Sequence, residues 1–134
     1  ENGIEFDEAL TLCGYFERDI ARNTLMSFLE DDDHPEIDGI FTGDDEAAIG
    51  VYDALAAAGL RIPDDVKVVG FDDSSLAPFL TPPLTTVRAP TEEVGRSAAK
   101  QLFSLLEGRY AQPETIHHTQ IIIRRSCGCS EHDI

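Results

Sequence analysis

The feature that most limits how this chain can fold is the alternation of short apolar runs with helical stripes. Short apolar runs of this kind suit strands that are buried on both faces of a parallel sheet. We therefore predict four strands, over Ala9–Phe16, Ile37–Thr42, Val66–Phe71 and Ile116–Arg125.

The segments between these runs carry apolar residues at the spacing of one helical face. Gly59 and Gly108 are predicted to end the second and third helices, because glycine favours the backbone turn that follows a helix. Strands that alternate with helices predict an α/β fold, a parallel sheet flanked by helices. The three stripes are Ala21, Leu25, Phe28 and Leu29; Ala48, Val51, Tyr52 and Leu55; and Val94, Ala98, Leu102, Leu105 and Leu106.

The composition limits the partners of the chain. The 134 residues are 42% hydrophobic, which is enough for a core, and they carry a net charge of −16 from 26 acidic and 10 basic residues. Such a surface repels a phosphate backbone, so we expect no direct contact with nucleic acid. The sequence has no apolar run long enough to span a membrane. Its odd number of cysteines favours a reducing compartment.

The length suits one domain, or one lobe of a larger domain. The chain begins Glu1-Asn2-Gly3 without an initiator methionine. We therefore expect it to be part of a longer protein.

Candidate ligand-binding residues follow three of the predicted strands. In an open α/β sheet, ligands bind beyond the carboxyl ends of the strands. Those ends are Gly14-Tyr15-Phe16, Gly43-Asp44-Asp45 and Gly70-Phe71-Asp72-Asp73. An aromatic ring and two pairs of carboxylates are thus expected at one edge of the sheet.

Three interpretations fit this edge. An aromatic face and carboxylate acceptors suit a sugar or a nucleobase-like ligand. Alternatively, the acidic pairs can hold Mg²⁺ for phosphoryl transfer. In the third interpretation, Asp44 and Asp45 only cap the following helix. No lysine follows either acidic pair closely, so we expect no catalytic metal site and no cofactor.

Three other segments invite a functional interpretation and have simpler ones. The acidic stretch Glu30–Glu36 lacks the spacing of a cation site and is expected to be a solvated turn. Leu80–Thr86 contains two prolines and must be extended, as a loop or a crossover between lobes. Cys127-Gly128-Cys129 resembles a soft-metal or redox pair, but a plain terminal segment is favoured.

Six ordered motifs together resemble a known family. The chain is similar to the effector-binding domain of LacI/GalR-type transcriptional regulators, which has a periplasmic-binding-protein-like fold. The resemblance covers almost the whole chain. It is carried by Ile37–Gly50, Ala58–Val66, Val69–Asp73, Pro82–Val87, Glu93–Ala99 and Arg124–Ser126.

The resemblance implies a clamp of two lobes, of which residues 1–134 form the C-terminal lobe. Residues 87–107 then form a crossover helix that belongs to the other lobe. Phe16 matches the position that stacks on the ligand ring, and Asp44 and Asp72 match positions that hydrogen-bond the ligand. Asp73 is expected to point away from the ligand and to matter little.

The resemblance also implies the function of the whole protein. It would be a cytoplasmic sensor, not an enzyme, that closes on a small effector and controls a separate helix-turn-helix domain. Only that domain would bind DNA, and no membrane is involved. A homodimer is expected through Ile49, Phe79 and Leu80.

Other outputs remain open from the sequence. The Cys-Gly-Cys ending is similar to relatives whose sensor is fused to a signalling domain, such as a kinase or cyclase. A sugar-transport binding protein and a Mg²⁺-dependent phosphotransferase are the remaining alternatives.

Overall fold

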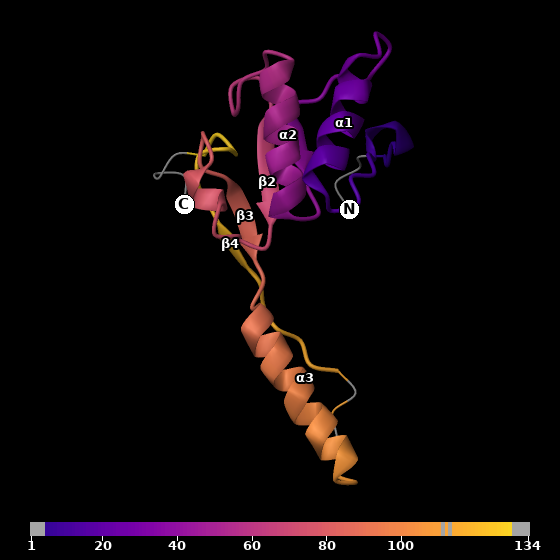
Figure 1. Cartoon of the computed structure of the whole chain (residues 1–134), viewed down its shortest axis with the longest axis vertical. Coiled ribbons are helices and arrows are strands. Elements are labelled where there is room, and N and C mark those ends of the chain that lie inside the picture. Colours follow the sequence, from indigo (N-terminus) through magenta and orange to yellow (C-terminus); the bar gives the residue numbers. More distant parts are fainter. Residues whose placement is uncertain (1–4, 111, 113, 130–134) are drawn as a thin grey trace.

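The chain forms one mixed sheet with helices on it and a long helix extending from it (Figure 1). The computed structural model describes residues 5–110, 112 and 114–129. The strands lie in the order β1-β2-β3-β4; β1, β2 and β3 are parallel, and β4 is antiparallel to β3. The elements are η1 Glu8–Leu10, α1 Arg18–Leu29, β1 Gly39–Phe41, α2 Asp45–Ala57, β2 Lys67–Phe71, η2 Ala77–Phe79, β3 Thr85–Arg88, α3 Thr91–Leu106 and β4 Gln120–Ile122.

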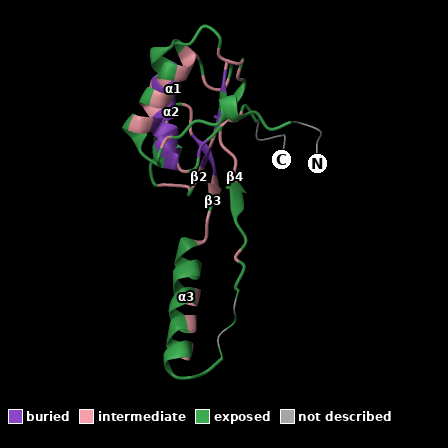
Figure 2. Cartoon of the chain, turned by 90° about the vertical axis from the view of Figure 1, so that its right-hand side faces the viewer, coloured by how far each residue is buried: buried purple, intermediate pink, exposed green. Residues whose placement is uncertain are grey.

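The core lies where α1 and α2 pack together and α2 packs on β2. Leu55, Val68 and Leu84 are completely buried there. Figure 2 shows the buried residues concentrated in this part of the molecule, whereas α3 is exposed along its length. The predicted alternation of strand, helix and strand is confirmed for β1, α2 and β2.

The chain after β4 returns to the sheet and fastens β2 to β3. The Ser126 hydroxyl is completely buried; it donates a hydrogen bond to the Val68 carbonyl at 2.6 Å and accepts one from the Thr85 amide at 2.8 Å. The Val68 amide in turn donates to the Ser126 carbonyl at 2.9 Å. The motif Arg124–Ser126 thus has a structural role at the start of these strands.

Several predicted boundaries need correction. Ala9–Phe16 is not a strand: a short 3₁₀ turn is followed by irregular chain, and Tyr15 and Phe16 adopt left-handed backbone conformations that turn the chain into α1. The strand expected over Ile116–Arg125 is limited to β4, because it pairs only where β3 runs beside it. Conversely, the extended segment expected at Leu80–Thr86 enters strand β3.

The fourth strand makes the sheet mixed instead of wholly parallel. The register pairs Thr86 with Ile122 and Arg88 with Gln120, so β3 and β4 run side by side in opposite directions. β3 leads out to α3 and β4 leads back from it (Figure 1). No helix of the described residues is long and apolar enough to cross a bilayer.

Gly50 sets how closely α1 and α2 can approach. A Cβ atom at this position would lie 2.1 Å from the Arg18 carbonyl oxygen, whereas a Cβ atom at Gly95 in α3 would meet nothing within 4 Å. Replacing glycine by alanine inside a helix is otherwise favourable by about 0.5–1 kcal/mol. The two glycines therefore form a matched pair with opposite expectations.

We predict that Gly50→Ala lowers the free energy of unfolding by about 1–3 kcal/mol, because α1 must shift away from α2. Gly95→Ala should leave it unchanged or raise it. Urea unfolding followed by circular dichroism measures both variants. Equal stability of Gly50→Ala and the wild type would show that this helix contact is not tight.

Candidate ligand-binding site

The three residues predicted to bind ligand come together beyond the carboxyl ends of β1 and β2. In Figure 1 the carboxyl end of β2 points toward α3. The Phe16 ring lies over Gly43, where an added Cβ atom would be 2.8 Å from Phe16 Cε1. Asp44 follows Gly43 directly and is the N-cap residue of α2. Asp72 follows β2, close enough to feel the charges of Asp45 and Asp44. This edge is therefore the candidate site.

Asp45 has a structural role at this edge and does not face a ligand. Its side chain is 2% exposed and accepts hydrogen bonds from the Thr86 hydroxyl and the Ser74 amide, each at 2.6 Å. Gly70 leaves the necessary space, because a Cβ atom there would lie 2.2 Å from Asp45 Oδ1. Asp45 thereby ties the start of α2 to β3 and to the loop after β2.

Asp44 is the residue that caps α2. Its Oδ1 accepts a hydrogen bond from the Ala47 amide at 2.8 Å. None of the described residues donates a hydrogen bond to its second carboxylate oxygen. The capping interpretation is thus correct for Asp44 and wrong for Asp45, and the cap still leaves Asp44 one oxygen for a ligand.

Asp72 offers a second unfilled acceptor. Its carboxylate receives no hydrogen bond from the part of the chain that the structure describes, although its amide donates to the Val87 carbonyl at 2.8 Å. Desolvation and the nearby charges of Asp45 and Asp44 raise the pKa of Asp72. Hydrogen bonds from a ligand would stabilise the charged form and oppose this effect.

Backbone strain is concentrated at the same edge. Tyr15 and Phe16 have φ angles of 51° and 59°, and Asp72 and Asp73 have φ angles of 103° and 54°. Residues other than glycine rarely adopt positive φ angles, and such residues cluster at ligand-binding sites. The positive φ angles of Tyr15 and Phe16 could not be predicted from the sequence, because aromatic residues rarely adopt this conformation.

A cavity of about 490 Å³ lies beside β1, between helix α1 and the segment that precedes this helix. Its wall is mainly apolar, with Leu12, Leu25 and Phe28 among its residues. Tyr15, Phe16 and Gly43 also line it, so the cavity reaches the candidate site. Phe16 therefore has apolar space on its inner side as well as an exposed face.

Asp73 is held by two arginines. Arg124 Nη2 lies 2.6 Å from its Oδ1, and Arg88 Nε lies 2.7 Å from its Oδ2. Burial alone would raise the pKa of Asp73, but the hydrogen bonds from Arg124 and Arg88 outweigh it and hold the pKa below its usual value. Two arginines that lie far apart in the sequence thus meet on Asp73, and its expected small effect on ligand binding stays a prediction.

The three residues predicted at a dimer contact differ in their exposure to solvent. Ile49 is buried inside the chain, and Leu80 packs partly against the core. Phe79 in η2 is 81% exposed, and Leu76 beside it is also exposed. A contact with a second copy would thus rest mainly on Phe79.

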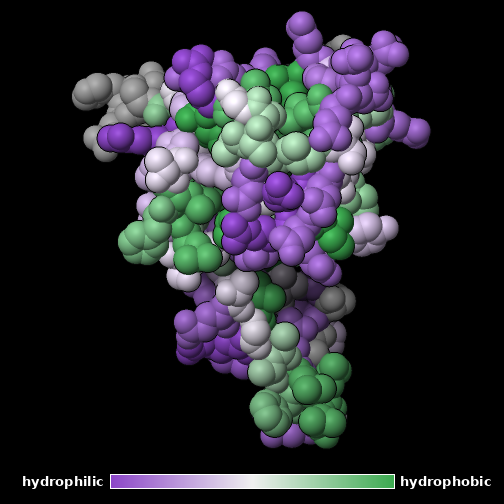
Figure 3. Space-filling model, turned by 45° about the horizontal axis from the view of Figure 1, so that its top comes forward, coloured by the Kyte–Doolittle hydropathy of each residue, from purple (hydrophilic) through white to green (hydrophobic). Residues whose placement is uncertain are grey.

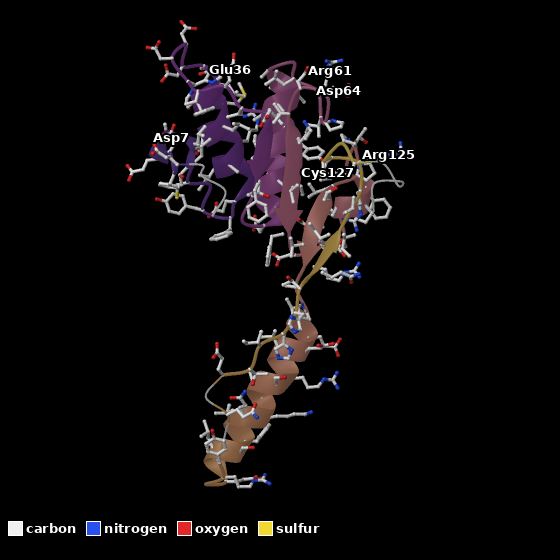
Figure 4. All side chains as sticks on the ribbon, turned by 180° about the vertical axis from the view of Figure 1, so that it is seen from behind. Asp7, Glu36, Arg61, Asp64, Arg125 and Cys127 are labelled. Carbon is white, nitrogen blue, oxygen red and sulfur yellow. The ribbon has the colours of Figure 1, made fainter. Side chains whose placement is uncertain are left out.

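The described cysteines and acidic residues do not form a cluster suited to a metal ion. Cys127, on the terminal segment of the body in Figure 4, receives a hydrogen bond on its sulfur from the Cys129 amide at 3.4 Å. Burial raises the pKa of the Cys127 thiol, but hydrogen bonds from Cys129 and Thr85 bring it below its usual value. Among the described residues, no three His, Cys, Asp or Glu side chains group so that they could hold a metal ion.

Comparison with known proteins identifies the family. The periplasmic binding protein-like domain matches residues 3–127. The chain is 35% identical over 125 residues to the HTH-type transcriptional regulator CelR of Thermobifida fusca. This alignment covers 92% of the present chain and 36% of CelR. The chain belongs to the periplasmic binding protein-like domains of LacI-family regulators.

Other members of the LacI family give the same result. The ribose operon repressor of Escherichia coli strain K12 is 34% identical over 123 residues, which are 92% of this chain and 37% of the repressor. The cellobiose complex of CelR matches with a TM-score of 0.84 at 35% identity, over 92% of this chain and 38% of that chain. A lactose complex of a LacI-family regulator from Arthrobacter sp. FB24 matches with a TM-score of 0.70 at 35% identity, over 83% of this chain and 42% of that chain.

These matches also define what part of the relatives the chain represents. It spans somewhat more than a third of the length of CelR and of the ribose operon repressor.

Proposed function

We propose that this chain is the sugar-binding C-terminal lobe of a LacI-type transcriptional regulator. The sugar binds at the carboxyl edge of the sheet and draws a second lobe onto it. The closed state then changes the DNA affinity of a separate helix-turn-helix domain in the cytoplasm. The chain itself has no catalytic role in this proposal.

The observation that carries the proposal is the pair of unfilled carboxylate acceptors beside an exposed aromatic ring. Asp44 has one carboxylate oxygen that accepts no hydrogen bond from the described residues, and Asp72 has two. The Phe16 ring lies over Gly43, the residue directly before Asp44. Sugar hydroxyls are hydrogen-bond donors, and the faces of sugar rings that carry only C–H groups pack on aromatic rings. The edge therefore offers the hydrogen-bond acceptors and the aromatic face that a sugar ligand requires.

The relatives support a sugar as the ligand class. Solved LacI-family structures similar to this chain are described as complexes with cellobiose and with lactose. The relatives reported above are named as transcriptional regulators or repressors. Those names favour a DNA-binding output over a kinase, a cyclase or a transport protein.

The exposed face of α3 supports the assignment of residues 87–107 to a second lobe. Leu102, Phe103, Leu105 and Leu106 are all more than half exposed. Figure 3 shows hydrophobic side chains gathered at the free end of this helix. A large exposed apolar surface commonly marks a surface that another part of a protein covers.

We predict that a sugar raises the melting temperature of the full protein that contains this chain, because a ligand that binds only the folded state stabilises it. A thermal-shift panel should include cellobiose, lactose, glucose and ribose, with guanine and hypoxanthine for the nucleobase class. Asp72→Asn should weaken binding of the responding sugar by roughly 10- to 150-fold, since a charge-assisted hydrogen bond is lost. Phe16→Leu should weaken it less, because part of the apolar contact survives.

Asp65→Asn is the control, because Asp65 bonds only to Arg61 at the far end of the body. A response to nucleobases alone would contradict a sugar ligand. Sugar affinity of Asp72→Asn within twofold of the wild type would contradict the assigned site.

We also predict a homodimer in which Phe79 is a contact residue. Phe79→Glu should shift the full protein toward the monomer in sedimentation equilibrium at tens of micromolar, because a charge would be buried without a partner. Phe6→Glu is the matched control, since Phe6 is an equally exposed phenylalanine near the N-terminus. A wild-type protein that is monomeric under these conditions would refute the prediction.

A further inference from the structure

The backbone that presents Asp72 is held on one side by β3. The Asp72 amide donates to the Val87 carbonyl at 2.8 Å, and the Asp73 amide donates to the Thr86 hydroxyl at 3.3 Å. The Ser74 amide then donates to the buried Asp45 carboxylate at 2.6 Å. Three successive amides thus have fixed partners, and the two residues in left-handed conformations lie at the start of this run.

The side chain of Asp73 adds a connection that these amides do not provide. It is 8% exposed, and each of its oxygens meets a different arginine. Arg88 is the last residue of β3, which leads to α3. Arg124 follows β4, which leads back from α3. One carboxylate therefore joins the end of β2 to the end of β3, where the chain leaves for α3, and to the segment that follows β4.

Arg124 makes this connection rigid. Its side chain is 16% exposed, compared with 52% for Arg88. Its Nη1 also donates to the Leu84 carbonyl at 2.7 Å, and its amide donates to the Thr85 hydroxyl at 2.8 Å. The guanidinium is consequently fixed in place before it meets Asp73, which reduces the entropy lost in forming the pair.

We propose that Asp73, together with Arg88 and Arg124, is a positioning residue that holds Asp72 in its strained, ligand-facing conformation. A carboxylate in this arrangement touches no ligand. It acts by fixing the backbone of its neighbour and by linking that backbone to the end of β3, from which the chain leaves for α3, and to the segment that follows β4.

Two consequences distinguish positioning from general stabilisation. Loss of the Asp73 charge should loosen residues 72–74 and 86–88 while the core around Leu55 and Val68 stays closed. Resting on the proposed function, it should also weaken sugar binding although no contact with the sugar is removed.

Hydrogen–deuterium exchange on the full protein without ligand tests the first consequence. In Asp73→Asn, the amides of residues 72–74 and 86–88 should exchange roughly tenfold faster or more, which corresponds to loss of about 1.4 kcal/mol of local protection. Arg124→Gln should have a larger effect than Arg88→Gln, because Arg124 is more buried and anchored. Asp65→Asn removes an equivalent pair of arginine contacts to Arg61 and should leave these amides unchanged.

Unchanged exchange at residues 72–74 in Asp73→Asn would overturn the proposal. Equal acceleration across the whole domain would overturn it as well, because Asp73 would then be only a stabilising residue. The sugar that binds the wild type tests the second consequence: affinity should fall in Asp73→Asn and stay constant in Asp65→Asn. If no sugar binds, the proposed function is refuted. The hydrogen–deuterium exchange result then still decides whether Asp73 holds the backbone of Asp72 in place.

Discussion

The candidate site depends on the buried carboxylate of Asp45 and on the hydrogen bonds that it accepts. A buried carboxylate is costly unless its oxygens are hydrogen-bonded, and here both are, by Thr86 and Ser74. Because Thr86 lies in β3, Ser74 follows β2 and Asp45 itself begins α2, one side chain fixes three elements that meet at the carboxyl edge. Asp44 and Asp72, on either side of this point, can then remain unpaired and available to a ligand.

Adjacent aspartates thus have different roles, set by their surroundings. Asp45 and Asp73 are buried and paired inside the protein, whereas Asp44 and Asp72 keep unfilled oxygens at the edge. The alternation follows from the backbone, because successive side chains leave a turn in different directions. Each acidic pair in the sequence therefore contains one buried, fully bonded carboxylate and one carboxylate with an oxygen that no described residue fills.

The sequence was sufficient for the three helices, for β1 and β2, and for bringing Phe16, Asp44 and Asp72 to one edge of the sheet. The helical stripes and the apolar runs at β1 and β2 depend on local periodicity, which a sequence displays directly. It was not sufficient for Ala9–Phe16, where an apolar run forms irregular chain because two left-handed residues turn it. Nor could it show that Arg88 and Arg124 meet on Asp73, since that contact exists only when β3 and β4 pair.

In the proposed function, the Asp72 carboxylate accepts hydrogen bonds from the bound sugar. Carboxyl ¹³C NMR titration of the full protein measures the pKa of Asp72 with and without the responding sugar. In the free protein, desolvation and the charges of Asp45 and Asp44 should hold this pKa above its ordinary value. Bound hydroxyl groups stabilise the charged form, so the sugar should lower it. A pKa of Asp72 that the sugar leaves unchanged or raises would show that this carboxylate does not accept hydrogen bonds from the sugar.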